Sequence, residues 1–93
     1  MPKYSIIAHH RVHKFLRNIV DENFKQAVIE NIIKLENYPI SLRDMDIEKI
    51  KGMEKTFRIR IGKHRIIFYV DNAENKIYVT NIDARKNAYK KRS

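Results

Sequence analysis

The stretch of sequence that decides the fold is "FRIRIGKHRIIFYV", which runs from Phe57 to Val70. Apolar side chains alternate with basic ones in its first half, which is the period of a β-strand with one buried face. Gly62-Lys63 then fits a two-residue hairpin loop of type II′, because glycine stands at the first position of the loop. We therefore predict that this stretch folds as an antiparallel hairpin.

The two-residue loop fixes which residues face each other across the predicted hairpin. It sets Ile61 opposite His64 and Arg60 opposite Arg65, and the ladder continues from these pairs. Since side chains alternate between the two faces of a sheet, Arg58, Arg60 and Arg65 share one face. The other face is apolar, and we expect helices to cover it. It carries Phe57, Ile59, Ile61, Ile66 and Phe68.

The three arginines on one face need a chemical explanation. Like charges directly opposite each other destabilise a sheet by about 0.2–1 kcal/mol per pair, and neither predicted strand contains an acidic residue. One explanation is a solvated basic face that prevents aggregation of the sheet. We favour a phosphate site, because the planar guanidinium fork matches phosphate oxygens. Lys63 in the loop would add a further positive charge beside this face.

The segments before the hairpin predict a strand and two helices. A short strand is expected over Lys3–Ala8, and helical apolar spacing begins at His9. Asp21 fits the N-cap of a second helix. That helix should end near Glu36 or Asn37, because a proline follows and disfavours helical geometry in the residue before it.

The order of elements predicts an α+β fold. After an irregular connection over 40–55, we expect three strands at Thr56–Ile61, His64–Val70 and Lys76–Ile82, with a turn at Asp71–Asn75. The fold would then be an N-terminal strand, a helical hairpin and a C-terminal antiparallel meander. Its helices would pack on one face of a four-stranded sheet. The length of 93 residues favours one domain over residues 1–93.

The composition restricts the possible partners and chemistry. The chain carries 20 Lys and Arg against 11 Asp and Glu, a formal net charge of +9, which favours a polyanion such as RNA as partner. It has no cysteine, which excludes disulfides, thiolate catalysis and Cys-based zinc sites. No apolar run is long enough for a signal peptide or membrane span, so we expect a cytoplasmic protein that does not bind membranes. The histidines in "HHRVH" lack a nearby acid, so no metal site is expected there.

The end of the chain, "IDARKNAYKK", adds candidate site residues. Arg85 and Tyr89 are four residues apart, so in a helix or tight turn their side chains point the same way. A phenol among arginines suits a nucleotide, because the ring can stack on a base while the cations hold phosphates. Further RNA or ribosomal RNA contacts are expected from Lys63, Lys86, Lys90 and Lys91.

Three motifs together resemble a known family. They are "IEKIKG", the hairpin "FRIRIGKHRIIFYV" and the closing "IDARKNAYKK", which together span about Ile47 to Lys91. The chain resembles the RelE-type toxins of toxin–antitoxin pairs, in the RelE/ParE superfamily. The resemblance implies a metal-independent endoribonuclease without a cofactor, which cuts mRNA in the A site of the ribosome. It also implies a cognate antitoxin protein as partner.

The resemblance also implies roles for individual residues. In this family the ribose 2′-hydroxyl attacks the adjacent phosphate, and basic residues stabilise the charge that builds up. Arg58 and Arg60 match the basic-x-basic strand of the family. Arg65 matches the strand arginine expected to hold the reacting phosphate, and Arg85 with Tyr89 matches the C-terminal pair.

This chain departs from the family pattern at two points. Relatives often carry lysines at the positions of Arg58 and Arg60, and a histidine at the position of Ala84. Arginine, with a pKa above about 12, is a poor proton acceptor. Tyr89 is therefore our first choice as general base, since His64 lies on the other face by strand parity. We expect cleavage to be slow.

Two alternative functions stay open at this point. The first is a ParE-type toxin of the same fold, which poisons DNA gyrase and does not cut RNA. The second is a basic RNA-binding module without catalytic activity.

Overall fold

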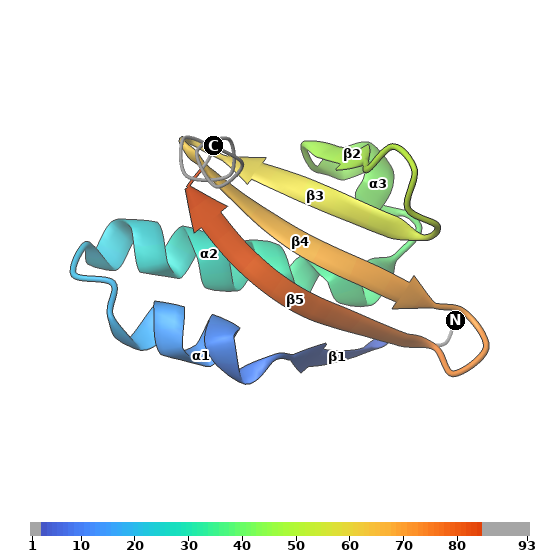
Figure 1. Ribbon diagram of the computed structural model, residues 1–93, viewed down its shortest axis with the longest axis horizontal. Helices are drawn as coiled ribbons and strands as arrows, with labels where there is room; N and C mark the ends of the chain where they lie inside the picture. The colour runs from blue at the N-terminus through green and yellow to red at the C-terminus, as the bar shows by residue number, and fades with distance from the viewer. Residues whose placement is uncertain (1–2, 85–93) are drawn as a thin grey trace.

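The computed structural model describes residues 3–84 of the chain. Within this range the backbone forms one sheet with strand order β1-β5-β4-β3-β2, and helices lie on one side of it (Figure 1). The strands are β1 (Ser5–Ala8), β2 (Ile47–Lys49), β3 (Thr56–Ile61), β4 (His64–Asp71) and β5 (Lys76–Ala84). The helical elements are α1 (His10–Arg17), α2 (Glu22–Lys34), the 3-10 turn η1 (Leu35–Asn37) and α3 (Ser41–Asp44).

The predicted α+β fold is confirmed, with one strand more than expected. The sheet has five strands because β2, inside the connection that showed no regular pattern, pairs antiparallel with the outer edge of β3. At the opposite edge, β1 pairs parallel with β5, and the pairs between β3, β4 and β5 are antiparallel. The outermost positions of the sheet are therefore occupied by its two shortest strands, which is a common way to limit edge pairing with other chains.

The register of the central hairpin is the predicted one. Ile61 lies opposite His64, and Arg60 lies opposite Arg65. Gly62 has a φ of +58°, a value that glycine adopts without strain at the first loop position. The parity of every side chain in β3 and β4 follows from this short loop.

The apolar face of the hairpin forms the core together with the helices. The ring of Phe57 stacks on that of Phe68 with 5.3 Å between centroids. The His64 ring lies against Phe15 and Phe24 of the helical layer, with centroids 5.8 and 4.6 Å apart, so His64 lies on the face away from the arginines, as predicted. The buried apolar residues are Val12, Val28, Leu35, Phe57, Ile59, Ile66, Phe68, Val70, Ile77, Val79 and Ile82.

A bulge in β5 determines which of its side chains face the arginines. Phe68 pairs with Val79, whereas the preceding residue of β4, Ile67, pairs with Asn81, so Thr80 is an extra residue in the ladder. An inserted residue exchanges the faces of all residues after it. Ile82 is therefore buried in the core, and Asn81 shares the arginine face with Ile67.

The start of α2 is fixed by the predicted cap. The carboxylate oxygen Oδ1 of Asp21 accepts hydrogen bonds from the backbone N–H groups of Asn23 and Phe24, at 3.0 and 3.2 Å. Glu22 in the first turn adds a favourable charge at the positive end of the helix dipole. The helix then presents Val28 to the core.

Removal of this cap should destabilise the protein measurably. We expect Asp21→Ala to lower the free energy of unfolding by about 0.5–2 kcal/mol, because two backbone donors lose their acceptor. Urea denaturation followed by circular dichroism measures the change. Asp21→Asn keeps an acceptor oxygen and should cost clearly less; an equal loss in both variants would show that the cap itself is unimportant.

Candidate active site

Three arginines meet on the face of the sheet away from the helices. Arg58 and Arg60 come from β3 and Arg65 from β4, and the apolar residues between them are buried on the other face. Directly opposite residues such as Arg60 and Arg65 have Cβ atoms about 4.5–5.5 Å apart. Arg58 precedes Arg60 by two residues on β3, which places it about 7 Å from Arg60. We call Arg58, Arg60 and Arg65 the arginine cluster.

Two carboxylates from the β2 segment lie against this cluster. Glu48 pairs with Arg58 in the β2–β3 register, and its Oε1 forms an ion pair with Nη2 of Arg58. Asp46 Oδ2 lies 3.3 Å from Nε of Arg60. Neither pair was predicted, because no strand was expected at β2 and the two predicted hairpin strands contain no acid. The arginine face is consequently not purely cationic.

A third carboxylate lies beside Arg65. Asp83 of β5 is opposite Arg65 in the β4–β5 register. The side-chain amide of Asn81 donates a hydrogen bond of 2.9 Å to Oδ2 of Asp83. The bulge at Thr80 is what brings both side chains to this face.

The remaining predicted site residues lie at one end of the sheet or outside the described range. Lys63 lies in the exposed β3–β4 loop, next to the end of the arginine cluster. β5 ends at Ala84, which lies opposite His64 at the same end of the sheet. The other predicted site residues lie outside the described residues; they are Arg85, Lys86, Tyr89, Lys90 and Lys91.

A hollow of about 730 Å³ adjoins the cluster on the side of β2. Arg58 and Glu48 both line it, so the ion pair forms part of its wall. Lys49 and Lys51 add two positive charges, and Gly52 leaves space at its border. A hollow with three cations and one carboxylate suits an anionic ligand.

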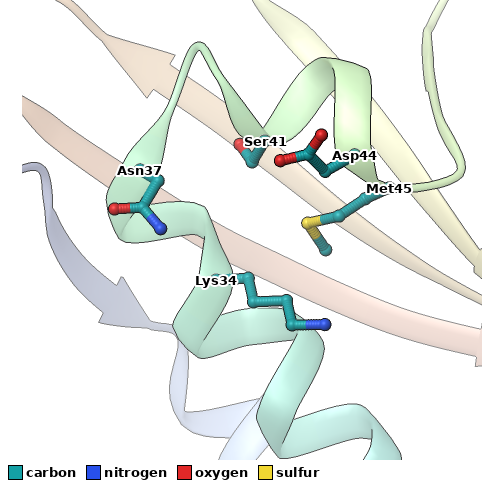
Figure 2. A pocket seen from close by; sticks show the side chains of 5 residues that line it. All are labelled: Lys34, Asn37, Ser41, Asp44 and Met45. Carbon is teal, nitrogen blue, oxygen red and sulfur yellow. The ribbon is translucent and has the colours of Figure 1, made fainter.

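A second hollow lies between α2, η1 and α3 and differs in charge (Figure 2). It measures about 220 Å³ and is lined by Lys34, Asn37, Ser41, Asp44 and Met45. The Ser41 hydroxyl is buried and has no hydrogen-bond partner among the described residues. With one cation and one acid, this hollow does not have the excess positive charge expected of a phosphate site.

One histidine at the start of α1, His9, has a structural role. Nδ1 of His9 accepts the backbone N–H of Arg11 at 3.1 Å and so caps the helix. Burial, the charge of Arg11 and that of His10 lower the pKa of His9. Over residues 3–84, no three His, Asp or Glu side chains are grouped so that they could hold a metal ion. Within the same range, no helix is both long and apolar enough to cross a bilayer.

Comparison with known proteins gives the family. A family model described as the ParE toxin of type II toxin–antitoxin systems matches residues 6–89. The chain belongs to this family. It is a RelE-type toxin of a toxin–antitoxin pair, as the resemblance of its motifs implied.

Individual relatives of this toxin carry the RelE name. "Putative toxin RelE1" of Methanocaldococcus jannaschii is 34% identical over 88 residues, which are 95% of this chain and 97% of the relative. The RelE–RelB complex of Pyrococcus horikoshii OT3 contains a chain with a TM-score of 0.76 and 24% identity, over 89% of this toxin and 96% of that chain. The isolated RelE toxin of E. coli has a TM-score of 0.70 and 15% identity, over 97% and 99%. At these identities the two solved structures establish the shared fold.

Proposed function

We propose that this toxin is a ribosome-dependent endoribonuclease that cleaves mRNA in the A site without a metal cofactor. The observation that supports it most directly is the arginine cluster, whose members come from two adjacent strands and share one face. Residues 1–93 would form a single toxin domain acting in the cytoplasm, where translating ribosomes are found. The proposal extends the family assignment to a reaction.

The reaction would be an attack of the ribose 2′-hydroxyl on the neighbouring phosphorus. A bond forms between O2′ and phosphorus while the bond to the 5′ oxygen of the next nucleotide breaks. The proton of the 2′-hydroxyl passes to a general base, for which we propose Tyr89. The departing 5′ oxygen takes up a proton from water. Negative charge increases on the phosphoryl oxygens in the transition state.

The arginine cluster would stabilise that charge. Guanidinium forks aimed at the phosphoryl oxygens act most strongly where charge develops, since they need no reorganisation during the reaction. We propose that Arg65 contacts the reacting phosphate, with Arg58, Arg60 and Arg85 beside it. Lys63 and three lysines of the C-terminal segment would hold the RNA backbone or ribosomal RNA; the three are Lys86, Lys90 and Lys91.

A cognate antitoxin would keep the toxin inactive. RelE chains of Pyrococcus horikoshii and Mycobacterium tuberculosis form complexes with RelB or RelB-type antitoxins. By analogy, we propose a protein antitoxin for this chain. Acidic segments of such a partner would compete with RNA for a surface on a chain of net charge +9.

A second function, poisoning of gyrase, is favoured by one observation. The family model that matches residues 6–89 is described as the ParE toxin. A toxin of that branch would leave mRNA intact and trap gyrase on DNA. A non-catalytic RNA-binding module would bind RNA with strong salt dependence and cut nothing.

One experiment separates these functions and tests the general base. Purified toxin is incubated with programmed ribosomes, and the mRNA 5′ ends are mapped. We expect cuts within the A-site codon, and Tyr89→Phe should lower the cleavage rate about 10²–10⁴-fold, because it removes the proton acceptor and keeps the ring. Full activity of Tyr89→Phe would exclude Tyr89 as base. Intact mRNA with wild-type toxin would exclude the nuclease.

A further inference from the structure

The β2 segment holds its two carboxylates against the arginines by backbone pairing as well as by charge. The backbone N–H of Arg60 donates to the carbonyl of Asp46 at 3.1 Å, so the main chain fixes Asp46 beside the side chain that it contacts. Glu48 lies directly opposite Arg58 in the same ladder. The backbone of each acidic residue is therefore fixed next to the arginine that its carboxylate contacts.

Each contact engages one side of its guanidinium. Asp46 meets Nε of Arg60, and Glu48 meets Nη2 of Arg58. A guanidinium carries five N–H donors in a planar fork, so a single contact leaves several donors for a phosphate. The carboxylates therefore orient the forks without saturating them.

The exposure of the pair between Asp46 and Arg60 argues against a purely stabilising role. The side chain of Arg60 is 46% exposed and that of its partner Asp46 is 56% exposed. Ion pairs in such surroundings contribute little to stability. The ion pair has a larger effect on the orientation of the arginine than on stability. Without it the arginine side chain samples many rotamers, and this freedom is lost when RNA binds.

The two carboxylates also lower the positive charge that RNA meets. Glu48 and Arg58 both line the hollow beside the cluster, so an RNA phosphate entering there meets the acid together with the base. Orientation of the forks favours the reaction, whereas the negative charge weakens binding. These opposite effects make the role measurable.

We propose that Glu48 and Asp46 are positioning residues of the phosphate site. They hold the guanidinium groups of Arg58 and Arg60 in the geometry needed for cleavage. Their negative charge makes RNA binding weaker than it would be without them. The inference rests on the proposed nuclease function and adds to it a role for the β2 segment.

The test compares binding and cleavage in Glu48→Gln and Asp46→Asn, which remove charge and keep shape. For a single-stranded RNA oligonucleotide, the Kd should fall several-fold. The slope of log Kobs against log salt should steepen by about 0.7 per variant. On programmed ribosomes, kcat should fall between about ten- and a hundredfold, as for a misplaced catalytic group. Glu30→Gln, which removes an exposed charge on α2, should change none of these three quantities.

Other outcomes would overturn the inference. If both variants bind RNA more tightly and also cleave faster, the carboxylates only compete with RNA. If kcat is unchanged in both, they have no positioning role. In an Arg58→Ala background, Glu48→Gln should have no further effect on kcat; an additive loss would show that Glu48 acts elsewhere. Equal Tm values in all variants would show that a change in kcat is not caused by a loss of folding.

The same variants distinguish failure of the positioning role from failure of the nuclease proposal. If Arg58→Ala lowers cleavage and Glu48→Gln does not, the positioning role fails and the nuclease stands. If wild-type toxin leaves mRNA intact, the nuclease fails and the positioning role falls with it.

Discussion

Arg65→Ala should lower the rate of mRNA cleavage on the ribosome by about 10²–10³-fold, the usual cost of removing one donor from a site that stabilises a developing negative charge. Arg65 lies on the central strand β4, with Arg60 opposite it on β3 and Asp83 opposite it on β5. Single-turnover cleavage of a ribosome-bound mRNA measures the effect on the chemical step.

Two further variants show whether the loss is specific. Arg65→Lys keeps the charge and loses the planar fork, so its rate should lie between those of wild type and Arg65→Ala. Arg17→Ala removes an exposed arginine from α1 and should leave the rate unchanged. If Arg65→Ala cleaves at the wild-type rate with an intact fold, Arg65 does not contact the reacting phosphate.

Phe68→Ala should cause the largest loss of stability. Phe68 is fully buried in the central strand β4, and its ring stacks on Phe57. Truncation of a buried phenylalanine costs about 3–5 kcal/mol, because contacts are lost and a cavity remains. A chain of this length has a free energy of unfolding of roughly 5–14 kcal/mol, so the substitution would remove a large part of it.

Chemical denaturation with urea, followed by circular dichroism, measures this loss. Tyr69→Ala is the matched control, because Tyr69 is the next residue along β4, lies on the opposite face and is 41% exposed. Its loss should be less than half as large. Similar losses in both variants would contradict the assignment of the core to the helix-covered face.

The central hairpin could be predicted in detail because its register depends on local sequence alone. A two-residue loop with glycine at Gly62 leaves one pairing, and that pairing determines the face of every side chain in β3 and β4. The shared face of the arginine cluster follows directly. The helix cap at Asp21 is equally local, since the side chain bonds to N–H groups two and three residues away.

The acidic partners could not be predicted because they depend on tertiary pairing. β2 is three residues long, with two charged side chains, and forms a strand only because β3 offers an unpaired edge. Glu48 and Asp46 were therefore not expected near the arginines. For Asp83 a signal existed: the apolar spacing of β5 changes phase between Val79 and Ile82, as the bulge at Thr80 requires.

The most direct test of the central claim is an NMR titration of the toxin with a short RNA whose reacting 2′-hydroxyl is blocked. The Nε–H signals of Arg58, Arg60 and Arg65 should shift together at one RNA concentration, while those of Arg17 and Arg43 stay unchanged. Shifts confined to other parts of the surface, with the three cluster signals unmoved at saturation, would contradict the claim that these side chains form one phosphate site.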